Sequence, residues 1–134
     1  MRFKHLAIVT FDLEKIYNFY LDYFGFELIK KYFRSDLDLD IRLIKKGELV
    51  LELLSVKKVK SKKRRACFKN FSFLSKVGYN HLCFESKNFE KDFRELKQNK
   101  DVKILIAPAR GTTGRQFFIE DPEGNIIEIY QTDL

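Results

Sequence analysis

The sequence predicts an α+β fold of two tandem βαβββ modules, which pair into one curved mixed sheet with the helices outside. Two observations predict this fold. The chain repeats itself with an offset of 76 residues, which places His5 on His81 and Glu52 on Glu128. Each half also shows the same order of elements: a short apolar strand, an amphipathic helix and three further strands. The chain of 134 residues is expected to form a single domain.

The first module is expected to span residues 1–56. A strand is predicted over residues 2–10, where apolar side chains dominate. Asp12 is a candidate N-cap, since its carboxylate can accept a hydrogen bond from a first-turn N–H. Helically spaced apolar residues follow, and Gly25 fits a C-terminal cap. Three more strands are expected at 26–33, 38–46 and 48–56.

The second module is expected to span residues 77–134 and to repeat this order. A strand is predicted over 79–86, and Asn88 is the candidate N-cap of the second helix. Residues 121–125, DPEGN, indicate a turn, because Pro fixes φ and Gly permits a positive φ. Further strands are expected near 102–107, 115–121 and 125–131. One four-stranded sheet with one helix leaves its other face bare, so two modules can pair around a concave inner face.

A basic linker, residues 57–76, is expected to join the modules. It holds nine of the 26 basic residues and no acidic one, so the rest of the chain has 17 basic residues against 19 acidic ones. This pattern is typical of a solvated connector. One alternative is a positive lip for an anionic substrate, with Lys62, Lys63, Arg64 and Arg65 as candidates. Nucleic-acid binding through interleaved Phe and Lys side chains is a further alternative, although the whole domain lacks the spread of positive charge that it needs.

Composition excludes several other classes. Hydrophobic residues make up 45% of the chain, which is enough for a packed core and argues against disorder. No apolar run is long enough to span a bilayer, and no membrane partner is expected. The two cysteines, Cys67 and Cys83, lack the spacing of a metal site. Since no export signal is recognised, we expect reduced thiols and a cytoplasmic protein.

The repeated histidines and glutamates carry the predicted chemistry. Strand side chains alternate between faces, so His5, Glu52, His81 and Glu128 can all project from the inner faces of their strands. An acid inside an apolar strand costs several kcal/mol unless it is paired or bound to a metal. Two carboxylates and two imidazoles form an N₂O₂ set for one divalent cation. Ni, Co and Zn are the leading candidates, and Mn and Fe are alternatives. For each residue alone, an ordinary strand position remains the other interpretation.

The chain resembles the vicinal oxygen chelate superfamily over nearly its whole length. HLAIVTFDLEKIYNFYLDYFGFEL is similar to the family's first strand and helix, and LVLELLS to its fourth strand. GYNHLCFES is similar to the opening of the second module, and GRQFFIEDPEGNIIEIYQ to the closing hairpin. The family includes glyoxalase I, methylmalonyl-CoA epimerase, extradiol dioxygenases and the fosfomycin- and bleomycin-resistance proteins. The resemblance implies the glyoxalase/bleomycin resistance/dihydroxybiphenyl dioxygenase fold.

The resemblance also implies an activity. The family's four ligand positions fall on His5, Glu52, His81 and Glu128, and four protein ligands are typical of glyoxalase I and the epimerase. A metal-dependent lyase or isomerase of the lactoylglutathione lyase type is therefore expected, in which the metal holds the substrate oxygens and stabilises an enediolate. Glu128 is expected to move the proton, with Glu52 as the second acid. The alternatives are an acyl-CoA epimerase or a non-catalytic, resistance-type protein that binds a small molecule.

The substrate is expected to be small and anionic, either a 2-oxoaldehyde–thiol adduct or a thioester. Asp22 stands where glyoxalase I enzymes often carry an Arg, which leaves glutathione as only one possible thiol. The candidate substrate-binding residues are Arg115, Tyr130, Cys83, Arg64 and Arg65. An ordinary surface role for Arg115 and an inert buried thiol at Cys83 are the competing interpretations. A homodimer is expected, with the modules paired within one chain or exchanged between two.

Overall fold

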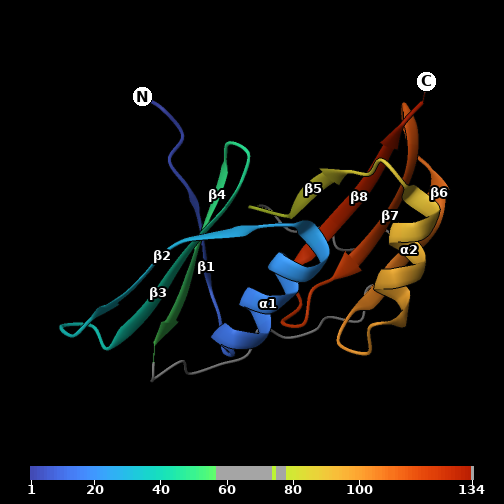
Figure 1. The fold of residues 1–134 in the computed structure, drawn as a ribbon. Helices are drawn as coiled ribbons and strands as arrows, with labels where there is room; N and C mark the ends of the chain where they lie inside the picture. Colours follow the sequence, from blue (N-terminus) through green and yellow to red (C-terminus); the bar gives the residue numbers. More distant parts are fainter. Residues whose placement is uncertain (57–73, 75–77, 134) are drawn as a thin grey trace. The chain divides into compact units, whose positions relative to one another are not determined.

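The structure is a computed structural model that describes residues 1–56, 74 and 78–133. The chain divides into two compact units, Met1–Lys63 and Arg64–Leu134. Each unit carries one βαβββ module (Figure 1), which confirms the predicted fold class of two tandem modules. The predicted basic linker falls, except for Leu74, outside the described residues.

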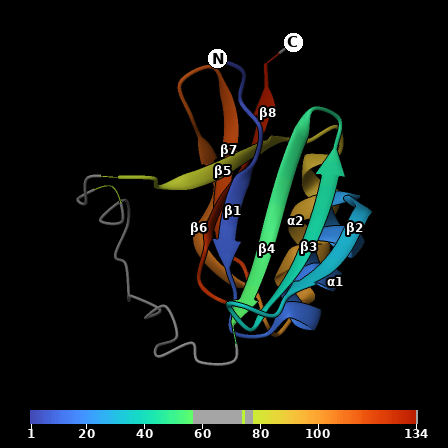
Figure 2. The same cartoon turned by 90° about the vertical axis from the view of Figure 1, so that its left-hand side faces the viewer.

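The first unit contains a four-stranded mixed sheet with one helix. Its strands stand side by side in the order β1-β4-β3-β2 (Figure 2), with β1 parallel to β4 and the other neighbours antiparallel. The bounds are β1 Leu6–Val9, α1 Leu13–Phe24, β2 Glu27–Arg34, β3 Leu39–Lys46 and β4 Leu49–Val56. These agree with the predicted elements, although β1 begins four residues later than the predicted strand, so that His5 directly precedes it.

The helix α1 lies where it does because its apolar residues form one stripe. Ile16 and Tyr20 are fully buried, as are Leu51 and Leu53 on the facing side of β4. Two apolar surfaces thus leave water together, which is the main favourable contribution to the unit's stability. The helix ends at Gly25, whose φ of +66° is the left-handed conformation that glycine adopts without strain.

The second unit repeats this architecture. Its strand order is β5-β8-β7-β6, again with the first strand parallel to the last. The bounds are β5 His81–Glu85, α2 Phe89–Gln98, β6 Lys103–Arg110, β7 Gly114–Glu120 and β8 Ile126–Thr132. The predicted turn before β8 is confirmed: the Asp121 carboxylate accepts hydrogen bonds from the backbone N–H groups of Glu123 and Asn125, at 2.9 and 2.8 Å.

An aromatic cluster holds α2 on its sheet. Phe117 of β7 is completely buried, and its ring meets the rings of Phe89 and Phe93 edge to face, each at 5.1 Å between centroids. Ile119 and Ile127 complete the buried layer. Edge-to-face aromatic pairs add to the free energy gained from burial alone, so this cluster is a main source of stability in the second unit.

An arginine of the central sheet ties each helix start to its strands. Arg42 pairs with Glu14 and lies over the Tyr17 ring, with 4.4 Å from the guanidinium carbon to the ring centroid. Arg115 pairs with Glu90, Nη2 to Oε1 at 2.5 Å, and the two glutamates are again 76 residues apart. The hydrogen bond from Arg42 lowers the pKa of Glu14. The sequence repeat therefore extends to this helix-to-sheet contact. In the part of the chain that the structure describes, no helix is long and apolar enough to cross a membrane.

The two predicted N-caps differ, which gives a matched stability test. The Asp12 carboxylate accepts a hydrogen bond from the Lys15 N–H at 3.1 Å, whereas the Asn88 side chain makes no capping hydrogen bond. We expect Asp12→Ala to lower the free energy of unfolding by about 1 kcal/mol. We expect Asn88→Ala to cost less, since no such bond is lost. Urea denaturation followed by circular dichroism measures both, and equal losses would contradict the capping role of Asp12.

Candidate functional site

The first unit brings His5 and Glu52 together. Their Nε2 and Oε2 atoms are 2.9 Å apart, and the side chains are 35% and 16% exposed. The parallel pairing of β1 with β4 sets Ala7 opposite Glu52, and His5 precedes Ala7 by two residues, so that it shares its face. The Tyr32 hydroxyl donates a long hydrogen bond of 3.5 Å to the second carboxylate oxygen. This acid is therefore paired, as an acid among apolar strand residues must be.

The second unit repeats the pair with His81 and Glu128. Nε2 and Oε2 are 3.1 Å apart, and the side chains are 25% and 13% exposed. Cys83 stands opposite Glu128 in the parallel ladder, the register that Ala7 and Glu52 have in the first unit. The Phe118 ring meets the imidazole edge to face at 5.5 Å. The two halves thus share the sequence spacing, the strand register and the side-chain contact.

The surroundings of His81 fix which ring nitrogen faces the acid. Nδ1 lies 2.7 Å from the side-chain oxygen of Asn80, so Nδ1–H donates to that oxygen. Nε2 is left to face the Glu128 carboxylate. Two electron-pair donors at this distance share either a proton or a cation, since their lone pairs repel otherwise. A neutral imidazole held in one orientation by its other nitrogen is also the usual arrangement of a metal-binding histidine.

The donor set fits a divalent cation in each half, with one nitrogen and one oxygen per unit. Among the described residues, no group of three or more His, Cys, Asp or Glu side chains gathers as a metal site within the structure. The joint set of His5, Glu52, His81 and Glu128 therefore stays a prediction, while each of its two pairs is formed.

Tyr130 shares the Glu128 face of β8 and is fixed by a neighbouring loop. Its hydroxyl accepts a hydrogen bond from the Thr113 N–H at 2.8 Å and lies 2.9 Å from the Thr113 hydroxyl. A Cβ on Gly111 would approach the Gln116 side chain to 2.7 Å and the Tyr130 ring to 3.1 Å. The close packing of this loop leaves the ring of Tyr130 in one position, from which it can shape a pocket beside Glu128.

The other candidate substrate-binding residues lie elsewhere. Arg115 is on the opposite face of β7 from Gln116, which pairs with Tyr130. Its guanidinium contacts Glu90 and lies 4.5 Å from the Phe89 ring centroid, at the start of α2. We therefore leave Arg115 out of the pocket proposed below. Arg64 and Arg65 lie outside the described residues. Sequence reasoning missed Gln116 and Phe118, which alternate with buried Phe117 and so reach the Glu128 face.

Cys83 lies beside the glutamate, and its thiol is kept protonated. Although the residue as a whole is exposed, partial burial of its thiol raises its pKa to about 12, and the Glu128 carboxylate contributes through its charge and a hydrogen bond. A thiol reacts as its thiolate, so this sulfur is a poor nucleophile at neutral pH. An inert thiol is thus the interpretation that the surroundings favour.

Alkylation tests this raised pKa. With Cys67→Ser as background, Cys83 is the one remaining thiol. In chelator-treated protein at pH 8, we expect iodoacetamide to modify Cys83 roughly a thousandfold more slowly than it does after unfolding in urea. Because the charge of Glu128 contributes more than that of Glu85, Glu128→Gln should accelerate the reaction more than Glu85→Gln. A folded-state rate equal to that in urea would contradict the raised pKa.

Comparisons with known proteins agree with this architecture. Residues 2–129 match the family model of the Glyoxalase/Bleomycin resistance protein/Dioxygenase superfamily. The uncharacterized protein YwkD of Bacillus subtilis (strain 168) is 28% identical over 133 residues, which cover 95% of this chain and 94% of that protein.

Two solved structures are similar in fold. A glyoxalase family protein from Bacillus cereus superimposes with a TM-score of 0.80 at 14% identity, over 98% of this chain and 94% of that one. The trypanothione-dependent glyoxalase I of Leishmania major gives a TM-score of 0.76 at 21% identity, over 98% and 86% of the two chains. At these identities the likeness is one of fold.

Proposed function

Because the chain belongs to the Glyoxalase/Bleomycin resistance protein/Dioxygenase superfamily, we propose that it is a metal-dependent lyase or isomerase of the glyoxalase I type. Its reaction is the transfer of a proton between carbon atoms next to a carbonyl group. The observation that carries the proposal is the repeated pair of His5 with Glu52 and His81 with Glu128, each within hydrogen-bond distance. A fold alone supports many functions, so this pair and not the fold is the basis of the proposal.

The proposed cofactor is one divalent cation held jointly by both pairs, with Ni, Co or Zn ahead of Mn and Fe. Two carboxylates neutralise its charge, and the two Nε2 atoms complete the donor set. When bound, such a cation supplies Lewis acidity that polarises a carbonyl oxygen. Asn80 and Phe118 hold the His81 ring in place for this role.

In the proposed reaction Glu128 takes the proton from the carbon beside the carbonyl and returns it to the neighbouring carbon. Its carboxylate is only 13% exposed, so bulk water competes little for the proton. Glu52, 16% exposed and contacted by Tyr32, is the second acid. Tyr130 and Gln116 line the adjoining face and contact the substrate, which we propose to be an anionic 2-oxoaldehyde–thiol adduct or a thioester.

We further propose that the protein is a cytoplasmic homodimer. Two other activities compete with the one proposed: an acyl-CoA epimerase, which would use the same metal and proton transfer, and a non-catalytic resistance-type protein. The resistance-type alternative is favoured only if the histidines and glutamates hold no metal, because the family description covers binding proteins as well as enzymes.

Metal analysis tests the proposal. For protein purified without chelator and reloaded with Ni, Co or Zn, we expect about one ion per chain, as a four-ligand site requires. At free metal 100-fold above the dissociation constant, the ion should stabilise the folded state by about 2.7 kcal/mol, seen as a rise in Tm. His81→Gln should abolish the rise, whereas Asn99→Gln, which alters an exposed helix end, should not.

Two outcomes would count against the proposal. Less than about half an ion per chain, with no rise in Tm, would favour the non-catalytic alternative. Metal binding without turnover of methylglyoxal plus glutathione on Ni, Co and Zn would remove the lactoylglutathione lyase assignment. In that case acyl-CoA epimerisation is the next activity to assay.

A further inference from the structure

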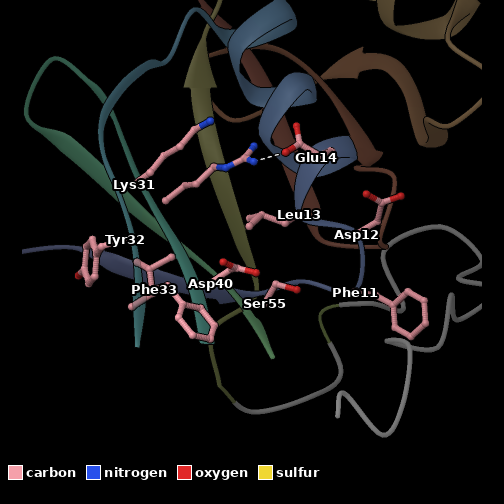
Figure 3. Close-up of a pocket in the computed structure, with 11 residues that line it drawn as sticks. Phe11, Asp12, Leu13, Glu14, Lys31, Tyr32, Phe33, Asp40 and Ser55 are labelled. Atoms are coloured by element: carbon pink, nitrogen blue, oxygen red, sulfur yellow. Dashed lines mark hydrogen bonds and ion pairs between the residues drawn. The ribbon is translucent and has the colours of Figure 1, made fainter. Parts of the chain in front are cut away.

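A second pocket lies in the first unit, on the side of the sheet that faces α1. Its volume is about 620 Å³, and it opens beside the start of that helix. Ser55 and Arg42 line it from the face of the strands opposite to Glu52. Figure 3 shows Lys31 and Glu14 at one end of this pocket and Asp40 at the other, beside Ser55. The pocket is thus separate from the His5–Glu52 pair.

A buried cation with a spare donor lies at the first end. The Arg42 side chain is 10% exposed, and its Nη2 pairs with Glu14. Its Nη1 is buried and has no hydrogen-bond partner among the residues that the structure describes. A buried guanidinium donor left unmade is costly, and native proteins satisfy almost all such groups. An acceptor supplied by a ligand in the pocket would satisfy this donor.

The same end has more positive than negative charge. Lys31 stands directly opposite Arg42 in the antiparallel pair of β2 and β3, so two like charges face each other. Glu14 neutralises only one of them. The positive end of the α1 dipole also lies here, since Leu13 begins the helix and lines the pocket. One additional negative charge would therefore be stabilised at this position.

The rest of the pocket limits what that ligand can be. The Phe11 and Phe33 residues that line it are 52% and 51% exposed, and with Leu13 they offer apolar contacts. Asp40 places a negative charge two residues along β3 from Arg42. A dianion that filled the pocket would approach this carboxylate and be repelled, whereas an apolar body would gain by covering the rings.

We infer that this pocket binds a small organic monocarboxylate with an apolar, ring-sized body. Its carboxylate accepts hydrogen bonds from Nη1 of Arg42 and from the Lys31 ammonium, and its apolar body covers Phe33 and Phe11. The site stands apart from the proposed metal chemistry, because it uses the opposite face of the sheet. The proposed enzymatic function can therefore fail without affecting this inference.

Benzoate is a suitable probe. In a titration of the isotopically labelled full chain, followed by amide chemical shifts at constant ionic strength, we expect saturable shifts around α1's first turn, β2 and β3 at millimolar benzoate. Benzyl alcohol, which has the same ring without the charge, should bind at least about tenfold more weakly. Inorganic phosphate should also bind about tenfold more weakly, because Asp40 opposes its second charge.

Two lysine variants provide a matched pair. Lys31→Gln and Lys30→Gln remove the same charge from adjacent positions of β2, but Lys30 points to the other face and lies over the Tyr32 ring, 5.1 Å from its centroid. We expect Lys31→Gln to weaken benzoate binding about threefold to tenfold and Lys30→Gln to leave it unchanged. Arg42→Lys should weaken it about tenfold or more, because the ammonium cannot reproduce the spare guanidinium donor.

If Arg42→Lys does not fold, Phe33→Ala takes its place, since the exposed ring can be removed without opening the core. It should weaken benzoate binding and leave the unfolding midpoint nearly unchanged. The inference is overturned if benzoate gives no saturable shifts, if phosphate binds as tightly, or if the two lysine variants have equal affinities. In the first case, water satisfies Nη1 of Arg42.

Discussion

Replacement of Glu128 by Gln is expected to lower turnover by about 10²–10⁴-fold, the range for loss of a positioned general base. Gln has nearly the same volume, so packing against the neighbouring strands is retained. Its amide cannot take the substrate proton, and it is a weaker metal ligand than a carboxylate. Turnover of methylglyoxal plus glutathione, measured alongside the metal content of the same sample, separates the two causes: activity lost with metal retained identifies Glu128 as the base.

The control is Glu85→Gln, the same change on the face of β5 that carries His81. Glu85 accepts a hydrogen bond from the Thr132 hydroxyl at 2.7 Å and makes no contact with His81 or Glu128 among the interactions of the described chain. We expect less than a twofold change, as for a substitution outside the reacting groups. Glu52→Gln completes the set. If it lowers turnover more than Glu128→Gln at equal metal content, Glu52 is the base.

The fold could be predicted because its signals are local and repeated. Alternating apolar residues place each strand, Asp12 and Gly25 bound the first helix, and both are found in those roles. The His–Glu pairs follow from the repeat: equal spacing of 47 residues in two modules of equal topology requires equal register. In each unit the carboxylate is then opposite the residue two positions after the histidine.

The surroundings of the site were harder to predict, because a strand shifted by one residue turns every side chain to the other face. Arg115 was taken as a substrate contact from its place at the start of a strand. Its parity with buried Phe117 and Ile119 puts it under the helix instead, and the repeat of Glu14 at Glu90 also indicated such a contact. The same parity would have identified Gln116. Sequence gives no comparable signal for Nη1 of Arg42, whose missing partner depends on packing.

Phe117→Ala should cause the largest loss of stability, about 3–5 kcal/mol, because it deletes a fully buried ring between Phe89 and Phe93. The cavity forms under α2, where both neighbouring rings lose their edge-to-face contacts. Phe3→Ala is the control: its side chain is 69% exposed, so the expected change is within about 0.5 kcal/mol. Urea denaturation measures both free energies of unfolding.

Hydrogen exchange on the same variant shows how far the damage extends. Each unit has its own buried layer, with Leu51 and Leu53 under α1 and Ile119 and Ile127 under α2. If the layers unfold separately, Phe117→Ala removes protection from the amides of α2, β7 and β8 and spares those of α1 and β4. Equal loss in both units would mean that the repeat unfolds as one cooperative body, and that the stability of one His–Glu pair depends on the core beneath the other.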